Sequence, residues 1–213
     1  MRGRLGRMKT SVVLFDAAGV LFPLNKVVGE ELQRRFGLAE EHLASFWSDG
    51  LYKELTLGRI GTEEFLAAFA ETFSLPRPEV TKQLFLDAFE KALSPMPGVQ
   101  ELLAQLKKTG VHLALLSDTV EMYTDVRHQL GYYKHFEKFF FSYEIGHRKP
   151  EPEAYQAVIN HYKVAPAEIF FVDDQPNNVE GAKQQGLRAV VFTDAQALER
   201  VFLQEGILLP AAK

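Results

Sequence analysis

The clearest pattern in the chain is a series of short apolar runs separated by amphipathic segments. Four of these runs read SVVLF (11–15), HLALL (112–116), IFFV (169–172) and RAVVF (188–192), and KFFFS (138–142) has the same character. Continuous runs of β-branched and aromatic residues are typical of parallel strands that are buried on both faces. Because helix-like segments separate the runs, we predict βαβ units and a mostly parallel sheet.

Helical periodicity is readable in the segments between the later runs. VQELLAQLKKTG (99–110) repeats an apolar residue every three or four positions and stops at Gly110, as helices commonly do at glycine. PEAYQAVINHYKV (152–164) and NVEGAKQQG (178–186) behave similarly. We also expect a helix from Val120.

The interval from residue 25 to residue 93 differs, because it holds amphipathic helical patterns and no convincing strand. The patterns are VVGEELQRRFG (27–37), EEFLAAFAETF (63–73) and VTKQLFLDAFEKAL (80–93). LPRPEV (75–80) is the clearest break, and SPMPG (94–98) marks the return to β/α alternation. We therefore predict an α/β fold: a Rossmann-like, doubly wound parallel core of residues 9–24 and 94–213, with a helical insertion of residues 25–93.

Composition narrows the functional classes. The 213 residues are 46% hydrophobic and carry a net charge of −4, which argues against a general nucleic-acid binder, whose surface would be basic. The sequence contains no cysteine. This excludes disulfides, thiolate metal sites and cysteine nucleophiles, and it fits a reducing compartment.

The N-terminal region superficially resembles a secretory signal. MRGRLGRMKTSVVLF is basic and then apolar, but its apolar part is about five residues long, against roughly 7–15 in a signal peptide. We interpret residues 1–8 as a disordered basic tail, with Met8 as an alternative start. Apolar runs elsewhere fall short of the ~20 residues that span a bilayer. We expect a cytoplasmic protein with no membrane partner.

Charged and hydroxyl-bearing residues follow the predicted strands. In open parallel sheets, ligands bind outside the carboxyl ends of the strands, near the point where the strand order reverses. A loop residue, Lys149, stands just before a helix that Pro150 and Glu151 would open. The residues predicted to converge at this edge are Asp16, Ser117, Asp118, Lys149, Asp173 and Asp174.

Converging carboxylates repel one another and need a proton or a cation to neutralise them. Mg²⁺ prefers oxygen ligands and suits Asp16 with the Asp173–Asp174 pair and a substrate phosphate. A carboxylate can attack phosphorus and form an aspartyl-phosphate. Lys149 and the hydroxyl or N–H of Ser117 would then hold the phosphoryl oxygens.

Each residue also has a structural explanation when taken alone. Asp16 is compatible with a turn or an N-cap, and Ser117 with capping the helix from Val120. Lys149 fits a solvated loop, and Asp173–Asp174 fits a turn. The order of these residues at the ends of successive strands favours a shared site.

Four motifs in this order resemble those of the haloacid dehalogenase-like (HAD) hydrolase superfamily. They read VVLFDAAGVL, ALLSDT, HRKPEP and FFVDDQPNNVEGA. The helical insertion after the first motif is similar to the type C1 cap. HRKPEPEAYQ, VDDQPNNVEGA and the insertion phrase LGRIGTEEF resemble the subgroup of α-D-glucose-1-phosphate phosphatases and the phosphatase domain of soluble epoxide hydrolase.

This resemblance implies catalytic and substrate-binding roles. It makes Asp16 the nucleophile, Ser117 a ligand of the phosphoryl group and Lys149 the cation that neutralises charge between them. Asp118 joins the substrate-binding set at a position where the subgroup commonly has asparagine. Because a carboxylate facing a phosphate would repel it, we expect Asp118 to point away unless it is protonated or metal-bound.

The resemblance also implies an Mg²⁺ site. Asp16 and Asp174 would ligate the ion directly, with the backbone carbonyl of residue 18. Asp173 would support the metal shell or pair with Lys149, and Asn178 would orient this motif. The family's acid–base aspartate is replaced by Ala18, so the carbonyl ligand survives and the acid–base group does not.

We therefore expect a Mg²⁺-dependent phosphatase, monomeric or homodimeric, that hydrolyses a small phosphorylated metabolite such as a sugar phosphate through a phospho-aspartate. The alternatives are a 2-haloacid dehalogenase, suggested by FDAAG, and a degenerate binding or regulatory protein, suggested by Ala18. The insertion residues that could face the substrate or pack in a helical core are Phe46, Trp47, Tyr52 and Lys53. His147 is interpreted as a loop residue near the site.

Overall fold

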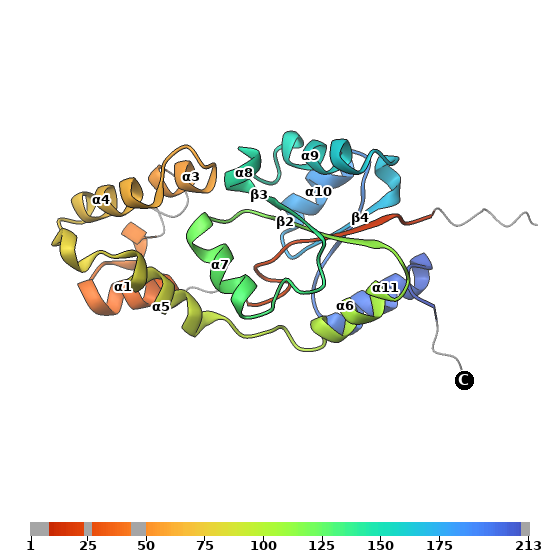
Figure 1. The fold of residues 1–213 in the computed structure, drawn as a ribbon, viewed down its shortest axis with the longest axis horizontal. Helices are drawn as coiled ribbons and strands as arrows, with labels where there is room; N and C mark the ends of the chain where they lie inside the picture. The colour runs from red at the N-terminus through yellow and green to blue at the C-terminus, as the bar shows by residue number, and fades with distance from the viewer. Residues whose placement is uncertain (1–8, 24–26, 44–49, 210–213) are drawn as a thin grey trace, which may run out of the picture.

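A five-stranded parallel sheet forms the centre of the molecule (Figure 1). The computed structural model describes residues 9–23, 27–43 and 50–209. The strands are β1 (Val12–Phe15), β2 (His112–Ser117), β3 (Lys138–Phe141), β4 (Ile169–Asp173) and β5 (Arg188–Val191), in the order β3-β2-β1-β4-β5. All five predicted strands are confirmed, and so is the Rossmann-like fold.

The order of the strands determines where a ligand site lies. From the central β1 the chain builds β2 and β3 toward one edge, and then crosses back to place β4 and β5 on the other side. Leu14 in β1 accordingly aligns with Ala114 in β2 and with Phe171 in β4. The strand order reverses at β1, and this is the position at which open parallel sheets bind ligands.

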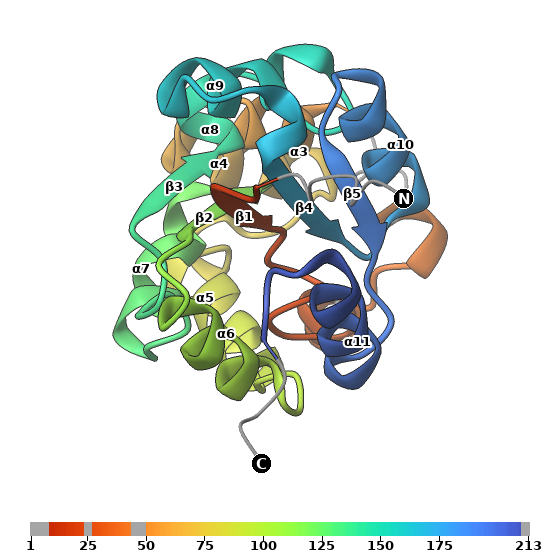
Figure 2. The ribbon, with the colours of Figure 1, turned by 90° about the vertical axis from the view of Figure 1, so that its right-hand side faces the viewer.

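Helices cover both faces of the sheet (Figure 2). One face carries α6 (Val99–Lys107) and α11 (Ala195–Glu205), and the other carries α9 (Pro152–Tyr162) and α10 (Pro176–Gln184). Val13 and Phe15 pack on the first side, and Val12 and Leu14 on the second. Burial on both sides explains why the strands read as uninterrupted apolar runs.

Three further elements belong to this part of the chain. They are α7 (Glu121–Gln129), α8 (Ser142–Ile145) and the 3₁₀ turn η2 (Pro166–Glu168). No helix among residues 9–23, 27–43 and 50–209 is both long enough and apolar enough to cross a membrane.

Three helix boundaries differ from the prediction. The helix expected to open at Pro150 begins at Pro152, because Pro150 lies in a turn in which the Glu151 N–H donates to the Arg148 carbonyl. Proline is well suited to the first helical position, where its missing N–H is not needed. The helix expected from Val120 begins at Glu121, and the one expected at 178–186 spans 176–184.

The helices α1 (Val27–Phe36), α3 (Leu51–Thr56), α4 (Thr62–Thr72) and α5 (Lys82–Ala92) lie between β1 and α6, with the 3₁₀ turn η1 (Arg77–Glu79) inside the predicted break. These helices, hereafter the helical segment, share an apolar cluster around Phe65 and Phe85. Met122 and Tyr123 of α7 pack into the same cluster, and the Tyr123 ring stacks on Phe89 at 4.0 Å. The division at residues 24/25 and 93/94 stays a prediction.

Gly58, in the loop after α3, marks a close approach between the helical segment and α8. Its φ is +68°, and a Cβ there would lie less than 3.0 Å from the Tyr143 carbonyl oxygen. We expect Gly58→Ala to lower the free energy of unfolding by more than Gly37→Ala, since Gly37 also has a φ of +68° but nothing within 4 Å. The positive φ alone costs about 1–2 kcal/mol. Urea unfolding of both variants measures the difference, and equal losses would contradict the predicted clash.

Candidate active site

Three carboxylates meet at the carboxyl ends of β1 and β4. Asp16 follows β1, Asp173 ends β4 and Asp174 comes next. One oxygen from each lies within 4.8 Å of the others. Asp16 and Asp173 are buried and Asp174 is half-buried. The parallel sheet thus brings together acidic residues that are more than 150 positions apart in the chain.

Lys149 connects the two buried carboxylates. Its Nζ lies 2.5 Å from Asp16 Oδ1 and 2.8 Å from Asp173 Oδ2. The side chain is almost fully buried. Burial acts to lower the pKa of the ammonium, but Asp16, Asp118 and Asp173 together raise it above its ordinary value. Lys149 is therefore a fixed positive charge within the acidic cluster.

This single ammonium does not fully compensate the cluster. Burial raises the pKa of the Asp16 carboxyl from 3.8 to about 7; Lys149 opposes the rise, and Asp173 adds to it. Desolvation and like charges both favour the neutral carboxyl. A further cation beside Asp16 would restore its ionised form at neutral pH.

Asp173 has most of its hydrogen-bonding capacity filled by the protein. Asn178 Nδ2 lies 3.1 Å from each of its oxygens, and the Gln175 N–H donates to Oδ1 over 2.8 Å. The contact with Lys149 and the contact with Asn178 both agree with what the family resemblance implied. Asp173 is consequently held in place, and Asp174 is the more open carboxylate of the pair.

A tight turn after β1 brings the backbone against Asp174. The Gly19 N–H donates to the Phe22 carbonyl over 2.7 Å, and the Leu21 N–H to the Ala17 carbonyl over 2.8 Å. Gly19 has a φ of +85°, and a Cβ on it would lie less than 3.0 Å from three atoms of the Asp174 carboxylate. Only glycine admits this approach. The turn that contains residue 18 therefore borders the acidic cluster.

The end of β2 contributes Ser117 and Asp118. Ser117 is buried. Asp118 Oδ1 accepts the Lys149 N–H over 3.1 Å, so the side chain turns toward the lysine loop. Whether the carboxylate faces a bound phosphate stays a prediction, and the loop offers it an N–H partner. Burial raises the pKa of the Asp118 carboxyl, and Lys149 opposes that rise.

The helical segment places Tyr52 near these groups. Its ring packs against Phe65, with centroids 6.1 Å apart. Burial raises the pKa of the Tyr52 phenol, Arg127 and Arg148 lower it, and Asp118 raises it. The hydroxyl is therefore within electrostatic range of the strand ends. Lys53 is exposed, and Phe46 and Trp47, for which the sequence allowed either a substrate-facing or a core position, lie outside the described residues.

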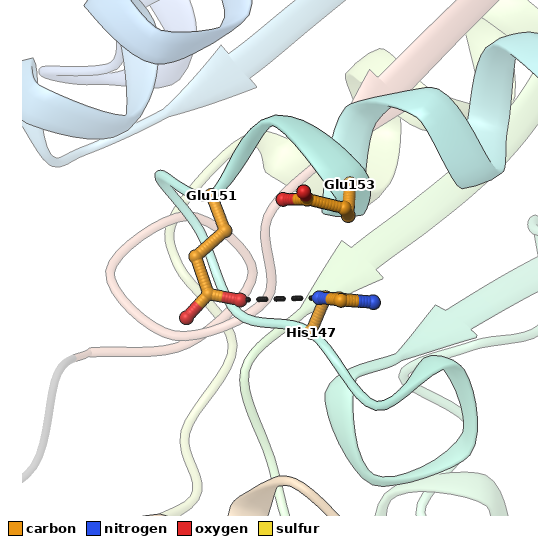
Figure 3. Close-up of side chains that lie close together, drawn as sticks. All are labelled: His147, Glu151 and Glu153. Atoms are coloured by element: carbon orange, nitrogen blue, oxygen red, sulfur yellow. Dashed lines mark hydrogen bonds and ion pairs between the residues drawn. The ribbon is translucent and has the colours of Figure 1, made fainter.

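Sequence reasoning missed a small cluster on the loop that carries Lys149. His147, Glu151 and Glu153 have donor atoms within 4.8 Å of one another (Figure 3). Glu151 Oε2 lies 3.3 Å from His147 Nδ1 and also accepts the Arg148 N–H over 3.3 Å. The spacing of four between His147 and Glu151 was a readable signal. These contacts brace the backbone on either side of the lysine.

A known protein family and individual relatives match this chain over most of its length. The family model for haloacid dehalogenase-like hydrolases matches residues 10–186. Flavin mononucleotide hydrolase 1 of Arabidopsis thaliana is 24% identical over 207 residues, which cover 97% of this chain and 82% of the relative. D-ribitol-5-phosphate phosphatase of Bacteroides thetaiotaomicron is 27% identical over 186 residues, which cover 82% of this chain and 87% of the relative.

Solved structures show the same fold. A HAD family enzyme from Bacteroides thetaiotaomicron, crystallised in complex with magnesium and inorganic phosphate, superposes with a TM-score of 0.76. It is 23% identical, and the match covers 91% of this chain and 99% of that chain. The arrangement of helices and strands is therefore shared over almost the whole length of both proteins.

Proposed function

This chain belongs to the haloacid dehalogenase-like hydrolase family, and we propose that it is a Mg²⁺-dependent phosphatase acting on a small phosphorylated metabolite through a phospho-aspartate. The observation that carries the proposal is the buried acidic cluster of Asp16, Asp173 and Asp174, bridged by Lys149. Relatives named as phosphatases of sugar and sugar-alcohol phosphates support this chemistry.

The donor set fits Mg²⁺. Three ionised carboxylates and one ammonium leave two negative charges, which a divalent cation balances. Asp16, Asp174 and the backbone carbonyl of Ala18 would hold the ion, and Asp173 supports them from beside Lys149. All are oxygen donors, as Mg²⁺ prefers. When bound, the ion supplies positive charge that lets the anionic phosphate approach the anionic Asp16.

Asp16 acts as the nucleophile in the proposed reaction. Its carboxylate oxygen attacks phosphorus, a new O–P bond forms, and the ester P–O bond to the leaving alcohol breaks. Water then attacks the phospho-aspartate, which releases phosphate and regenerates Asp16. Lys149 neutralises the charge that develops between nucleophile and phosphoryl group, and Ser117 binds a phosphoryl oxygen.

The leaving group takes its proton from water, because Ala18 carries no acid. The enzyme is therefore best suited to esters that need little protonation, such as sugar 1-phosphates. Asp118, whose carboxylate accepts the Lys149 N–H, is a candidate to supply part of this function. We further propose that residues 25–93 act as a cap over the core of residues 9–24 and 94–213, with Tyr52 facing the substrate and excluding water.

Two alternatives differ in what they predict. A 2-haloacid dehalogenase would need to bind a carboxylate substrate beside Asp173 and Asp174, which would repel it. A degenerate binding protein, suggested by Ala18, would retain no turnover. Neither accounts as well for a buried lysine held between two carboxylates.

A panel of sugar phosphates, assayed for phosphate release with and without EDTA, tests the function. We expect steady release that EDTA abolishes and Mg²⁺ restores. Chloride release from a 2-chloroacid without metal would establish the dehalogenase alternative instead. No release from any substrate at high protein concentration would refute the phosphatase.

The turn glycine provides a test of the metal site. We expect Gly19→Ala to weaken Mg²⁺ binding by about 10- to 100-fold, the usual cost of displacing groups around a metal, because the added Cβ pushes the Asp174 carboxylate away. Calorimetric titration with Mg²⁺ measures this. Gly110→Ala is the matched control, since Gly110 has a φ of +81° and nothing within 4 Å. Equal Mg²⁺ affinity in the two variants would contradict the assignment of Asp174.

A further inference from the structure

One buried cation has no role in the proposed reaction. Arg127 in α7 is only 4% exposed. Its Nη1 lies 2.8 Å from Thr119 Oγ1 and 3.2 Å from the Tyr133 hydroxyl. The guanidinium carbon lies 4.8 Å from the ring centroids of both Phe22 and Phe89. Because the protein encloses this group, its contacts link segments of the chain to one another.

The two rings that flank Arg127 belong to different parts of the molecule. Phe22 ends the turn that follows β1 and packs edge-on against the Tyr132 ring, with centroids 5.6 Å apart. Phe89 belongs to α5 of the helical segment and stacks on Tyr123. A guanidinium is attracted to the face of an aromatic ring. The position of Arg127 is therefore fixed relative to both the turn after β1 and α5.

Arg127 donates to the loop of residues 118–120, which joins β2 to α7 and begins directly after Ser117. Its acceptor in the loop, Thr119, is buried. The Thr119 N–H donates to Ser142 Oγ over 3.0 Å, and this hydroxyl donates to the Thr119 carbonyl over 3.1 Å. The N–H, the carbonyl and the hydroxyl of Thr119 are therefore all engaged, by side chains from two other helices.

The position of this loop matters for the proposed reaction, because Ser117 is the proposed ligand of the phosphoryl group. A displacement of about 1 Å in a site can cost about 100-fold in rate. Side chains keep the productive geometry only when contacts around them hold them in place. Burial raises the pKa of the Tyr133 phenol; Arg127 acts to lower it, and Asp16 to raise it. The contacts of Arg127 thus lie within electrostatic range of the proposed nucleophile.

We propose that Arg127 is a positioning residue that holds the loop of residues 118–120 through Thr119, so that Ser117 meets the phosphoryl group at Asp16. This rests on the proposed function, and it adds to the site a residue that does not stand at a strand end. The aromatic rings fix the guanidinium, the guanidinium fixes Thr119, and Thr119 fixes the path by which the chain leaves β2.

Binding of inorganic phosphate in saturating Mg²⁺, measured by calorimetry, tests this without turnover. Arg127→Met keeps an unbranched side chain but removes the donor and the charge. We expect the dissociation constant of phosphate to rise about 10- to 100-fold, the usual cost of removing a supporting partner, with an unchanged number of binding sites per chain. Mg²⁺ affinity is expected to stay at the wild-type value, because its proposed ligands, Asp16, Ala18 and Asp174, lie on other segments.

A double-variant cycle shows whether Arg127 acts through Thr119. Thr119→Val removes the acceptor and leaves the arginine between its two rings, and we expect a similar loss of phosphate affinity. Two residues that act through one contact are not additive, so the double variant Arg127→Met/Thr119→Val is expected to bind no more weakly than the weaker single variant. Arg127→Lys keeps the charge and one donor group and is expected to keep part of the affinity.

Arg200→Met is the matched control, since it makes the same chemical change at an exposed position in α11. It is expected to bind phosphate as tightly as the wild-type protein. If Arg127→Met reduces only the number of binding sites, or weakens Mg²⁺ and phosphate by the same factor, the residue supports the fold only and the inference is overturned.

The remaining outcomes also decide the inference. If the losses of the two single variants add in the double variant, Arg127 does not act through Thr119 and the inference is overturned. If Arg127→Met does not fold, Thr119→Val decides, and wild-type phosphate affinity in that variant overturns the inference. If the wild-type protein binds phosphate and the variants match it, only the inference falls. If the wild-type protein binds no phosphate in Mg²⁺, the phosphate site itself fails and both proposals fall.

Discussion

Replacing Asp16 with asparagine is expected to abolish phosphate release while the protein stays folded. An amide has no anionic oxygen to attack phosphorus, and loss of a nucleophile typically lowers kcat on the order of 10⁴- to 10⁶-fold. The fold is expected to persist because Lys149 keeps its contact with Asp173 at 2.8 Å. The substitution also removes a carboxyl whose pKa burial raises to about 7, so folding has no ionised group to desolvate there.

Phosphate release and thermal unfolding measured on the same preparation test this expectation. Asp194→Asn is the matched control, since it makes the same chemical change at an exposed position that caps α11. It is expected to keep wild-type activity. If Asp16→Asn retains more than a small fraction of wild-type turnover, a different group is the nucleophile and the proposed phospho-aspartate is wrong.

Introducing an acid at position 18 is expected to raise activity on poor leaving groups. General acid–base catalysis contributes about 10²- to 10⁴-fold, and Ala18→Asp would supply it to alkyl esters whose alcohol needs a proton. Sugar 1-phosphates are expected to gain far less. Ala18 lies partly exposed in the turn after β1, which borders the acidic cluster.

The ratio of kcat/KM for an alkyl phosphate to that for a sugar 1-phosphate measures this gain. Ala18→Asn is the matched control, because the asparagine side chain has the size and shape of aspartic acid but no acidic proton. An equal change for both substrates would contradict the missing-acid account. No change for either would show that another group, with Asp118 as the first candidate, already protonates the leaving alcohol.

Much of the fold is readable from local sequence for a definite physical reason. Strands buried on both faces are largely apolar, so VVLF (12–15) and IFFV (169–172) stand out as continuous runs, each followed directly by an aspartate. In a parallel sheet the ends of such runs meet at one edge. The gathering of Asp16, Asp173 and Asp174 therefore follows from where each run stops.

The sequence analysis assigned no helix at α11 (Ala195–Glu205), although local signals mark both of its ends: Asp194 caps the first turn and Gly206 follows the last.

Other features depended on contacts between distant segments. The turn of Asp118 toward the Lys149 N–H depends on a loop 31 residues away, and helix packing determines its direction. The close approach of the Asp174 carboxylate to Gly19 likewise requires that the ends of β1 and β4 lie side by side in the sheet.

The sequence by itself determined the parallel α/β architecture, the helical interval after the first strand and the set of residues at the strand ends. The reason is that hydrophobic periodicity, and the order of the apolar runs along the chain, are local properties of the sequence. Only the tertiary structure decided how charge is balanced. It placed Lys149 between two carboxylates and buried Arg127 between Phe22 and Phe89. Charge pairing is a property of distances across the fold, and no spacing along the chain encodes it.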